Sequence, residues 1–97
     1  MIKAVIIDDE LAMQEVNASL LAEYFPNIKL LGTANSIQTG IDLIGTKNPD
    51  LVLLDIELTD GSGFQLLQKL QPYNFKVVFI TGHDSFAIKA IKFSALD

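Results

Sequence analysis

Three short apolar runs set the pattern of this chain, and each run ends directly before a polar residue. The runs cover residues 4–7, 51–54 and 77–80, and the polar residues that follow them are Asp8, Asp55 and Thr81. Short continuous apolar runs separated by helical periodicity are typical of strands in a parallel sheet that is buried on both faces. Because such sheets bind ligands just beyond the carboxyl ends of their strands, we expect these side chains, together with Asp9, to meet there.

The segments between the runs carry helical periodicity. Apolar residues recur at helical spacing in two of them, namely Met13, Val16, Leu20 and Tyr24 in the first and Ile37, Ile41 and Ile44 in the second. We predict strands over residues 2–7, 28–33, 51–55 and 75–81, and helices over residues 11–24, 37–47, 63–70 and 85–93. With right-handed crossovers, this alternation predicts a parallel sheet with helices on both faces, an α/β sandwich.

The length allows one domain with one modest core, since 97 residues bury roughly 65% of their extended-chain surface. Ala95 and Leu96 resemble the start of a further strand. We therefore expect the chain to be part of a larger domain.

The composition narrows the classes of function. The chain is 49% hydrophobic, and its net charge of −5 with scattered basic residues argues against direct binding of nucleic acid. The apolar runs are too short to span a bilayer and the first strand leaves no room for a signal peptide, so we expect a cytoplasmic protein without membrane contact. The absence of cysteine excludes disulfides and thiolate metal sites, so a metal would have to bind oxygen.

Clustered carboxylates are the candidate chemistry. If the first and third strands are neighbours, Asp8, Asp9 and Asp55 converge, and two carboxylates about 4 Å apart at an effective dielectric near 20 repel by roughly 4 kcal/mol. A raised pKa on one carboxyl or a bound divalent cation would relieve that repulsion. Carboxylates without Cys or His suit Mg²⁺, which we predict as the cofactor.

Asp55 is the candidate nucleophile, because a carboxylate beside Mg²⁺ can attack a phosphoryl group and form an aspartyl phosphate. Thr81 is placed to donate a hydrogen bond to a phosphoryl oxygen and so to report phosphorylation. Structural roles compete with these, since an Asp of the first loop can cap the following helix and a β-branched residue at a strand end needs no function.

Nearby residues receive structural interpretations. Glu10 is a favourable charge near a helix N-terminus rather than a metal ligand. His83 is interpreted as an exposed loop residue, and Asp60 with Gly61 as turn chemistry. Gly63 serves close packing or the turn itself.

These residues resemble a bacterial two-component response-regulator receiver domain. The resemblance covers all 97 residues and rests on Asp8 and Asp9 after the first strand, Asp55 at the end of the third, Gly63 eight residues later and Thr81 before Gly82. Residues 54–58 and 84–90 are most similar to receivers that are joined to LytTR-type DNA-binding domains.

The resemblance implies a flavodoxin-like, three-layer fold with strand order 2-1-3-4-5. It implies that Asp55 is the phosphoacceptor, that Thr81 is the switch residue, and that Mg²⁺ is bound by Asp8, Asp9, Asp55 and the backbone carbonyl of Glu57. A sensor histidine kinase would donate the phosphoryl group, and a C-terminal DNA-binding output domain would respond in the parent protein. Such a domain is not an enzyme beyond its own phosphoryl transfer and hydrolysis, and a homodimer is common in the family.

The chain also departs from the family pattern. Thr59 stands where the family usually has proline. The fifth strand, the phosphate-binding lysine and the last helix would lie beyond Asp97, and none of Lys76, Lys89 and Lys92 matches that lysine. We therefore expect residues 1–97 to be a C-terminally incomplete receiver with strand order 2-1-3-4.

Two other functions stay open. Residues 55–59 resemble the first motif of haloacid-dehalogenase-type phosphohydrolases, with an acceptor carboxylate, a second acid two residues later and a threonine at the fourth. That motif normally opens its fold, and the chain has no room for a substrate-gating cap. The missing lysine instead favours an interaction module that binds Mg²⁺ without accepting a phosphoryl group.

Overall fold

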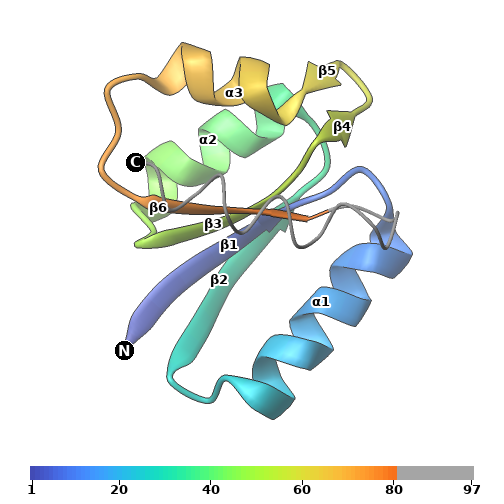
Figure 1. Cartoon of the computed structure of the whole chain (residues 1–97), viewed down its shortest axis with the longest axis vertical. Coiled ribbons are helices and arrows are strands. Elements are labelled where there is room, and N and C mark those ends of the chain that lie inside the picture. Colours follow the sequence, from blue (N-terminus) through green and yellow to red (C-terminus); the bar gives the residue numbers. More distant parts are fainter. Residues whose placement is uncertain (81–97) are drawn as a thin grey trace.

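The computed structural model describes residues 1–80, which form a parallel sheet with helices on both faces (Figure 1). The elements follow one another as β1 (Ile2–Ile7), α1 (Leu11–Tyr24), β2 (Ile28–Ala34), α2 (Ile37–Lys47), β3 (Leu51–Asp55), β4 (Glu57–Leu58), β5 (Gly61–Ser62), α3 (Gly63–Leu70) and β6 (Lys76–Ile80). All strands and helices predicted within this range are present. Thr81, the helix predicted over residues 85–93 and the strand start predicted at Ala95 and Leu96 lie outside the described residues.

The main sheet of the described part has the order β2-β1-β3-β6, with every pair parallel. This confirms the predicted order 2-1-3-4, with β6 as the fourth long strand. Ile7 at the end of β1 is in register with Ala34 of β2 and Leu54 of β3. The carboxyl ends of the three strands therefore reach the same edge of the sheet.

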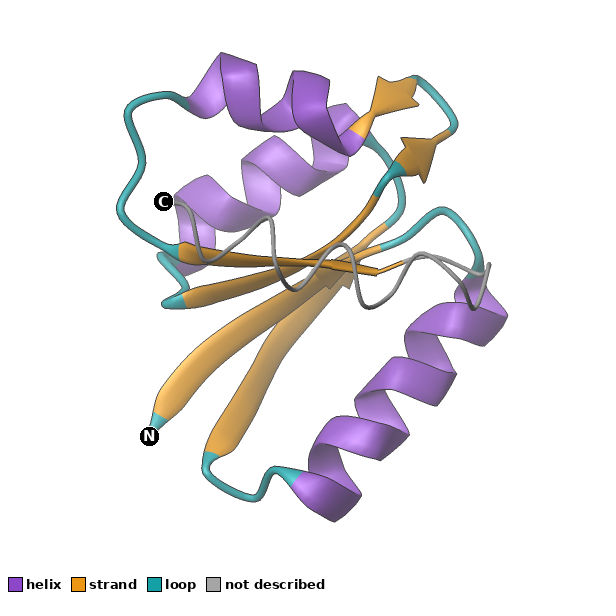
Figure 2. Cartoon of the chain, viewed as in Figure 1, coloured by secondary structure: helices purple, strands orange, loops and turns teal. Residues whose placement is uncertain are grey.

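The two faces of the sheet are covered by different helices. Helices α2 and α3 lie on one face and α1 on the other (Figure 2). The larger core, on the α2 and α3 face, is built from alternate residues of the central strands, among them Val5, Ile7, Val52, Leu54 and Phe79. Strand residues of opposite parity, such as Ile6 and Leu53, pack towards α1, as expected for strands buried on both faces.

Helix α1 is present as predicted, but the stripe that predicted it does not face the sheet. Leu21 is buried and Ala18 packs against the smaller core, whereas Val16 and Leu20 are 48% and 44% exposed. Apolar residues occur nearly all round this helix, so their spacing predicts a helix without selecting its inner face. The inner face also carries the buried polar residue Gln14.

Residues 57–62, between the predicted strand over 51–55 and the predicted helix over 63–70, form a small hairpin. Glu57 of β4 pairs with Ser62 of β5 in antiparallel fashion, and Leu58 pairs with Gly61. Gly61 has φ +146°, a conformation that other residues rarely adopt. Ser62 then begins α3 with a capping box that involves Gln65.

Within residues 1–80, no helix combines the length and the apolar character needed to cross a membrane.

Candidate functional site

Three carboxylates meet at the carboxyl edge of the sheet. Asp8 follows β1, Asp9 is the next residue, and Asp55 ends β3. One carboxylate oxygen from each lies within 4.8 Å of those of the other two. The parallel pairing of β1 with β3 produces this convergence, which the sequence predicted on the condition that these two strands are neighbours.

Asp8 is the most deeply buried of the three, with only 1% of its surface exposed. Its Oδ1 accepts a hydrogen bond of 2.9 Å from the backbone N–H of Glu10. Its Oδ2 is buried and has no hydrogen-bond partner among the described residues. Burial raises the pKa of this carboxyl, the negative charge of Asp9 adds to the rise, and the Glu10 N–H opposes it.

Asp55 is 6% exposed, and its Oδ1 accepts a hydrogen bond of 3.2 Å from the backbone N–H of Glu57. Burial raises the pKa of the Asp55 carboxyl to about 7, and the neighbouring charges of Asp8 and Asp9 contribute to the rise. The repulsion inferred from the sequence is therefore present in the fold. Near neutral pH and without a cation, the Asp55 carboxyl is therefore present in both its protonated and its ionised form.

The carboxylate oxygens of the cluster are suitable ligands for a divalent cation. All three side chains offer carboxylate oxygens, which suit Mg²⁺. The unpartnered Oδ2 of Asp8 is a buried acceptor that a cation would satisfy. A positive charge would also offset the burial and the mutual repulsion that together raise the pKa of Asp55.

Comparison with known families identifies the family to which this chain belongs. Residues 4–97 match the profile of the response regulator receiver domain, which is nearly the whole chain. The chain belongs to this family. The family consists of signalling modules rather than classical enzymes, which favours the receiver interpretation over the phosphohydrolase alternative.

The receiver domain matches parts of longer regulators. It is 39% identical over 98 residues to an uncharacterized response regulatory protein of Vibrio cholerae, covering 100% of this chain and 41% of that protein. It is also 39% identical to the sensory transduction protein LytT of Enterococcus faecalis, covering 95% of this chain and 38% of that protein. The chain thus spans about two fifths of the length of these relatives.

Solved structures show the same fold. The signal receiver domain of the putative response regulator NarL from Mycobacterium tuberculosis is 26% identical with a TM-score of 0.77, and the match covers 98% of this chain and 75% of that one. A two-component response regulator of the LuxR family from Aurantimonas is 21% identical with a TM-score of 0.76, covering 95% of this chain and 68% of that one. The predicted flavodoxin-like receiver fold is confirmed.

Several other residues that the sequence singled out lie either near the acidic cluster or outside the described residues. Glu57 lies in β4 with its backbone N–H towards Asp55, and ligation of a cation by its carbonyl stays a prediction. Glu10 is the N-cap residue of α1, and its side chain makes no cap hydrogen bond. Thr81 and His83 lie outside the described residues, as do Lys89 and Lys92.

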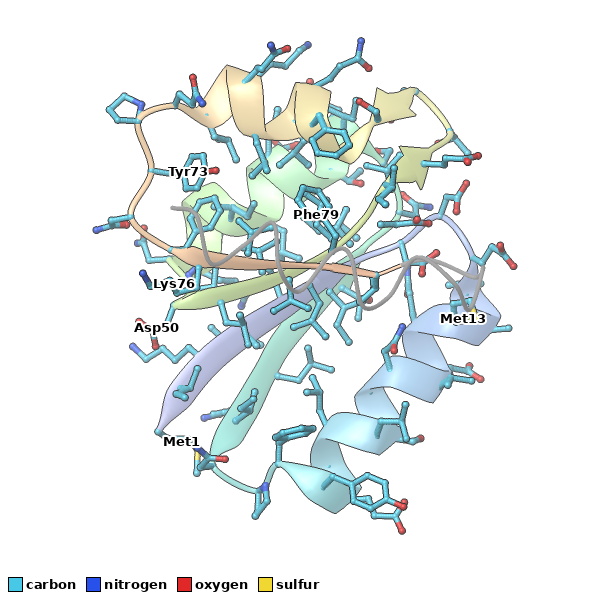
Figure 3. The ribbon with its side chains drawn as sticks, viewed as in Figure 1. Met1, Met13, Asp50, Tyr73, Lys76 and Phe79 are labelled. Carbon is cyan, nitrogen blue, oxygen red and sulfur yellow. The ribbon has the colours of Figure 1, made fainter. Side chains whose placement is uncertain are left out.

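Lys76 lies at the amino-terminal ends of the strands, whereas the carboxylates lie at the carboxyl ends. It is the first residue of β6 and is in register with Leu51, the first residue of β3. Figure 3 shows its side chain near Asp50, at the end of the sheet away from Met13 in the first turn of α1. This position agrees with the expectation from the sequence that Lys76 is not the phosphate-binding lysine of the family.

Two polar residues have roles that the sequence pattern did not show. Asp60 was interpreted as turn chemistry, but its carboxylate accepts hydrogen bonds from the backbone N–H groups of Ile37, at 2.7 Å, and Gln38, at 3.3 Å. The bond from Ile37 lowers the pKa of Asp60. Gln14 is buried beside the acidic cluster.

Proposed function

We propose that this receiver domain accepts a phosphoryl group on Asp55 from the phosphohistidine of a sensor histidine kinase. The observation that supports this most directly is the burial of Asp55 beside Asp8 and Asp9 at the carboxyl edge of the sheet. A carboxylate oxygen of Asp55 attacks phosphorus, the bond from phosphorus to the histidine nitrogen breaks, and that nitrogen leaves with the electron pair. The product is an aspartyl phosphate and a histidine that takes up a proton from solvent.

The residues that would hold Mg²⁺ are Asp8, Asp9, Asp55 and, through its backbone carbonyl, Glu57. Bound Mg²⁺ neutralises negative charge on the phosphoryl oxygens during transfer. Asp8, almost fully buried, holds one oxygen towards the site while the Glu10 N–H fixes the other. The Glu57 N–H restrains the rotation of the Asp55 carboxylate through Oδ1. The acidic cluster is thus organised before the phosphoryl group arrives.

Signalling would follow from the added charge. A phosphoryl group contributes about −1.5 to −2 charges at neutral pH, which is enough to reorganise hydrogen-bond donors near it. We propose Thr81 as the hydrogen-bond donor that responds to the phosphoryl group. A C-terminal DNA-binding output domain of the parent protein would respond to the resulting conformational change. A homodimer is a candidate for the active form. The relative LytT of Enterococcus faecalis is named a sensory transduction protein, which supports a role in signal transduction. The cytoplasm is the proposed compartment.

Phosphorylation can be tested with acetyl phosphate and Mg²⁺, followed by mass spectrometry of the intact chain. A mass increase of a single phosphoryl group that is lost with hydroxylamine is expected for an acyl phosphate. Asp55→Asn should abolish it, whereas Asp42→Asn, which changes a carboxylate on α2, should leave it unchanged. Equal incorporation into the Asp55→Asn variant would reject Asp55 as the acceptor.

A second candidate is an interaction module that binds Mg²⁺ without accepting a phosphoryl group. The position of Lys76 is compatible with it, because this lysine lies at the amino-terminal end of β6, away from Asp55. The same experiment separates the two functions. Saturable binding of Mg²⁺ with no mass increase from acetyl phosphate would support the interaction module.

A further inference from the structure

Gln14 is a buried glutamine that no part of the proposed phosphoryl transfer uses directly. It lies in α1 and is 6% exposed. Its Nε2 donates hydrogen bonds to the backbone carbonyl of Asp8, at 2.7 Å, and to that of Ala34, at 3.1 Å. Both partners are carbonyl oxygens, which only accept, so the amide must present its nitrogen to them. The two N–H groups of one side chain thus bond the residue that follows β1 and the last residue of β2.

These bonds tie the ends of neighbouring strands to α1. Ala34 is the last residue of β2, and its carbonyl also accepts a hydrogen bond of 3.0 Å from the backbone N–H of Asp8. Asp8 is therefore held at its N–H by Ala34 and at its carbonyl by Gln14. The direction of its Cα–Cβ bond follows from this backbone, since both of its peptide groups are fixed, and the Glu10 N–H then holds the carboxylate through Oδ1.

We infer that Gln14 is a positioning residue of the acidic cluster, because it fixes the turn from which the side chains of Asp8 and Asp9 extend. The inference rests on the proposed Mg²⁺ site. Groups that orient metal ligands typically change metal affinity by 10- to 100-fold when they are replaced. Gln14 acts here through the backbone of a ligand rather than through its carboxylate.

The test compares Gln14→Met with the matched control Gln68→Met. Methionine has a similar length but no donor, and Gln68 is an exposed glutamine on α3. The first readout needs no metal: hydrogen exchange of the Glu10 amide, which is bonded to Asp8 Oδ1, should become about tenfold faster only in Gln14→Met. The second is Mg²⁺ binding followed by NMR, where Gln14→Met should weaken the affinity about tenfold.

The outcomes separate the inference from the proposed function. A lowered melting temperature with unchanged Glu10 exchange would show a purely structural role and overturn the inference, as would unchanged Mg²⁺ affinity in a chain that binds Mg²⁺. If the wild type binds no Mg²⁺, the metal site fails and the exchange measurement alone decides the role of Gln14. If Gln14→Met does not fold, the wild-type side-chain amide decides: its protons should exchange at least tenfold more slowly than those of Gln68, and equal exchange overturns the inference.

Discussion

The backbone carbonyl of Asp55 lies so close to Gly63 that a Cβ on residue 63 would stand 2.5 Å from its oxygen. The same Cβ would lie 3.0 Å from Cγ of Leu54. The N–H of Gly63 donates a hydrogen bond of 2.8 Å to the carbonyl of Ile56. Helix α3 therefore begins directly against the strand end that carries the proposed phosphoacceptor, and a glycine at this position makes the contact possible.

Replacement of Gly63 by alanine should destabilise the domain. The added methyl group meets backbone rather than a flexible side chain, and overpacking of this kind costs about 1–3 kcal/mol. The measurement is the free energy of unfolding in urea. Gly45→Ala is the matched control, because Gly45 lies in α2 with open space around the position that an added Cβ would take. That variant should gain up to about 1 kcal/mol, since alanine favours helix over glycine.

The orientation of α1 can be tested with two adjacent leucines. Leu21 is 8% exposed in the smaller core, and Leu20 is 44% exposed. Leu21→Ala should lower the free energy of unfolding by about 2–4 kcal/mol because it leaves a cavity, and Leu20→Ala by less than about 1 kcal/mol. Urea unfolding of both variants measures the difference. A larger loss for Leu20→Ala would mean that the stripe with Val16 and Leu20 faces the sheet after all.

This pair of residues also shows what the sequence could and could not predict. The apolar runs before Asp8 and Asp55 specify buried parallel strands whose carboxyl ends lie together, whereas the strand order 2-1-3-4 came from the family resemblance. The inner face of α1 could not be predicted, because Leu20 and Leu21 are equally apolar and only packing against the sheet distinguishes them. The roles of Gln14 and Asp60 depend on hydrogen bonds to residues 20 and 23 positions away, which no local pattern encodes.

The stability of the metal-free domain should depend on pH through Asp55. Its pKa is about 7 in the folded chain against an ordinary value of 3.8, so between these values the folded state binds more protons than the unfolded state. Stability therefore falls as the pH rises through this window. Asp8 acts in the same direction, because its pKa is also raised.

The contribution of Asp55 is isolated by comparing wild type with Asp55→Asn in urea at pH 5 and pH 8 with a chelator present. The amide does not titrate, so the variant should lose less stability between the two values, and it should be the more stable protein at pH 8. Groups remote from Asp55 titrate equally in both chains and cancel in the comparison. Identical pH profiles would show that the Asp55 carboxyl has an ordinary pKa in the folded chain.

Binding of Mg²⁺ should raise the stability of the domain, since the cation binds the folded site and relieves its repulsion. At a concentration of one hundred times Kd, the expected gain is about 2.7 kcal/mol in the free energy of unfolding. Addition of EDTA should reverse the gain. Asp9→Asn should lose most of it, because it removes one carboxylate of the cluster, whereas Asp42→Asn on α2 should keep it. If Mg²⁺ stabilises Asp9→Asn as strongly as wild type, the cation binds elsewhere, and the acidic cluster serves the fold without a metal.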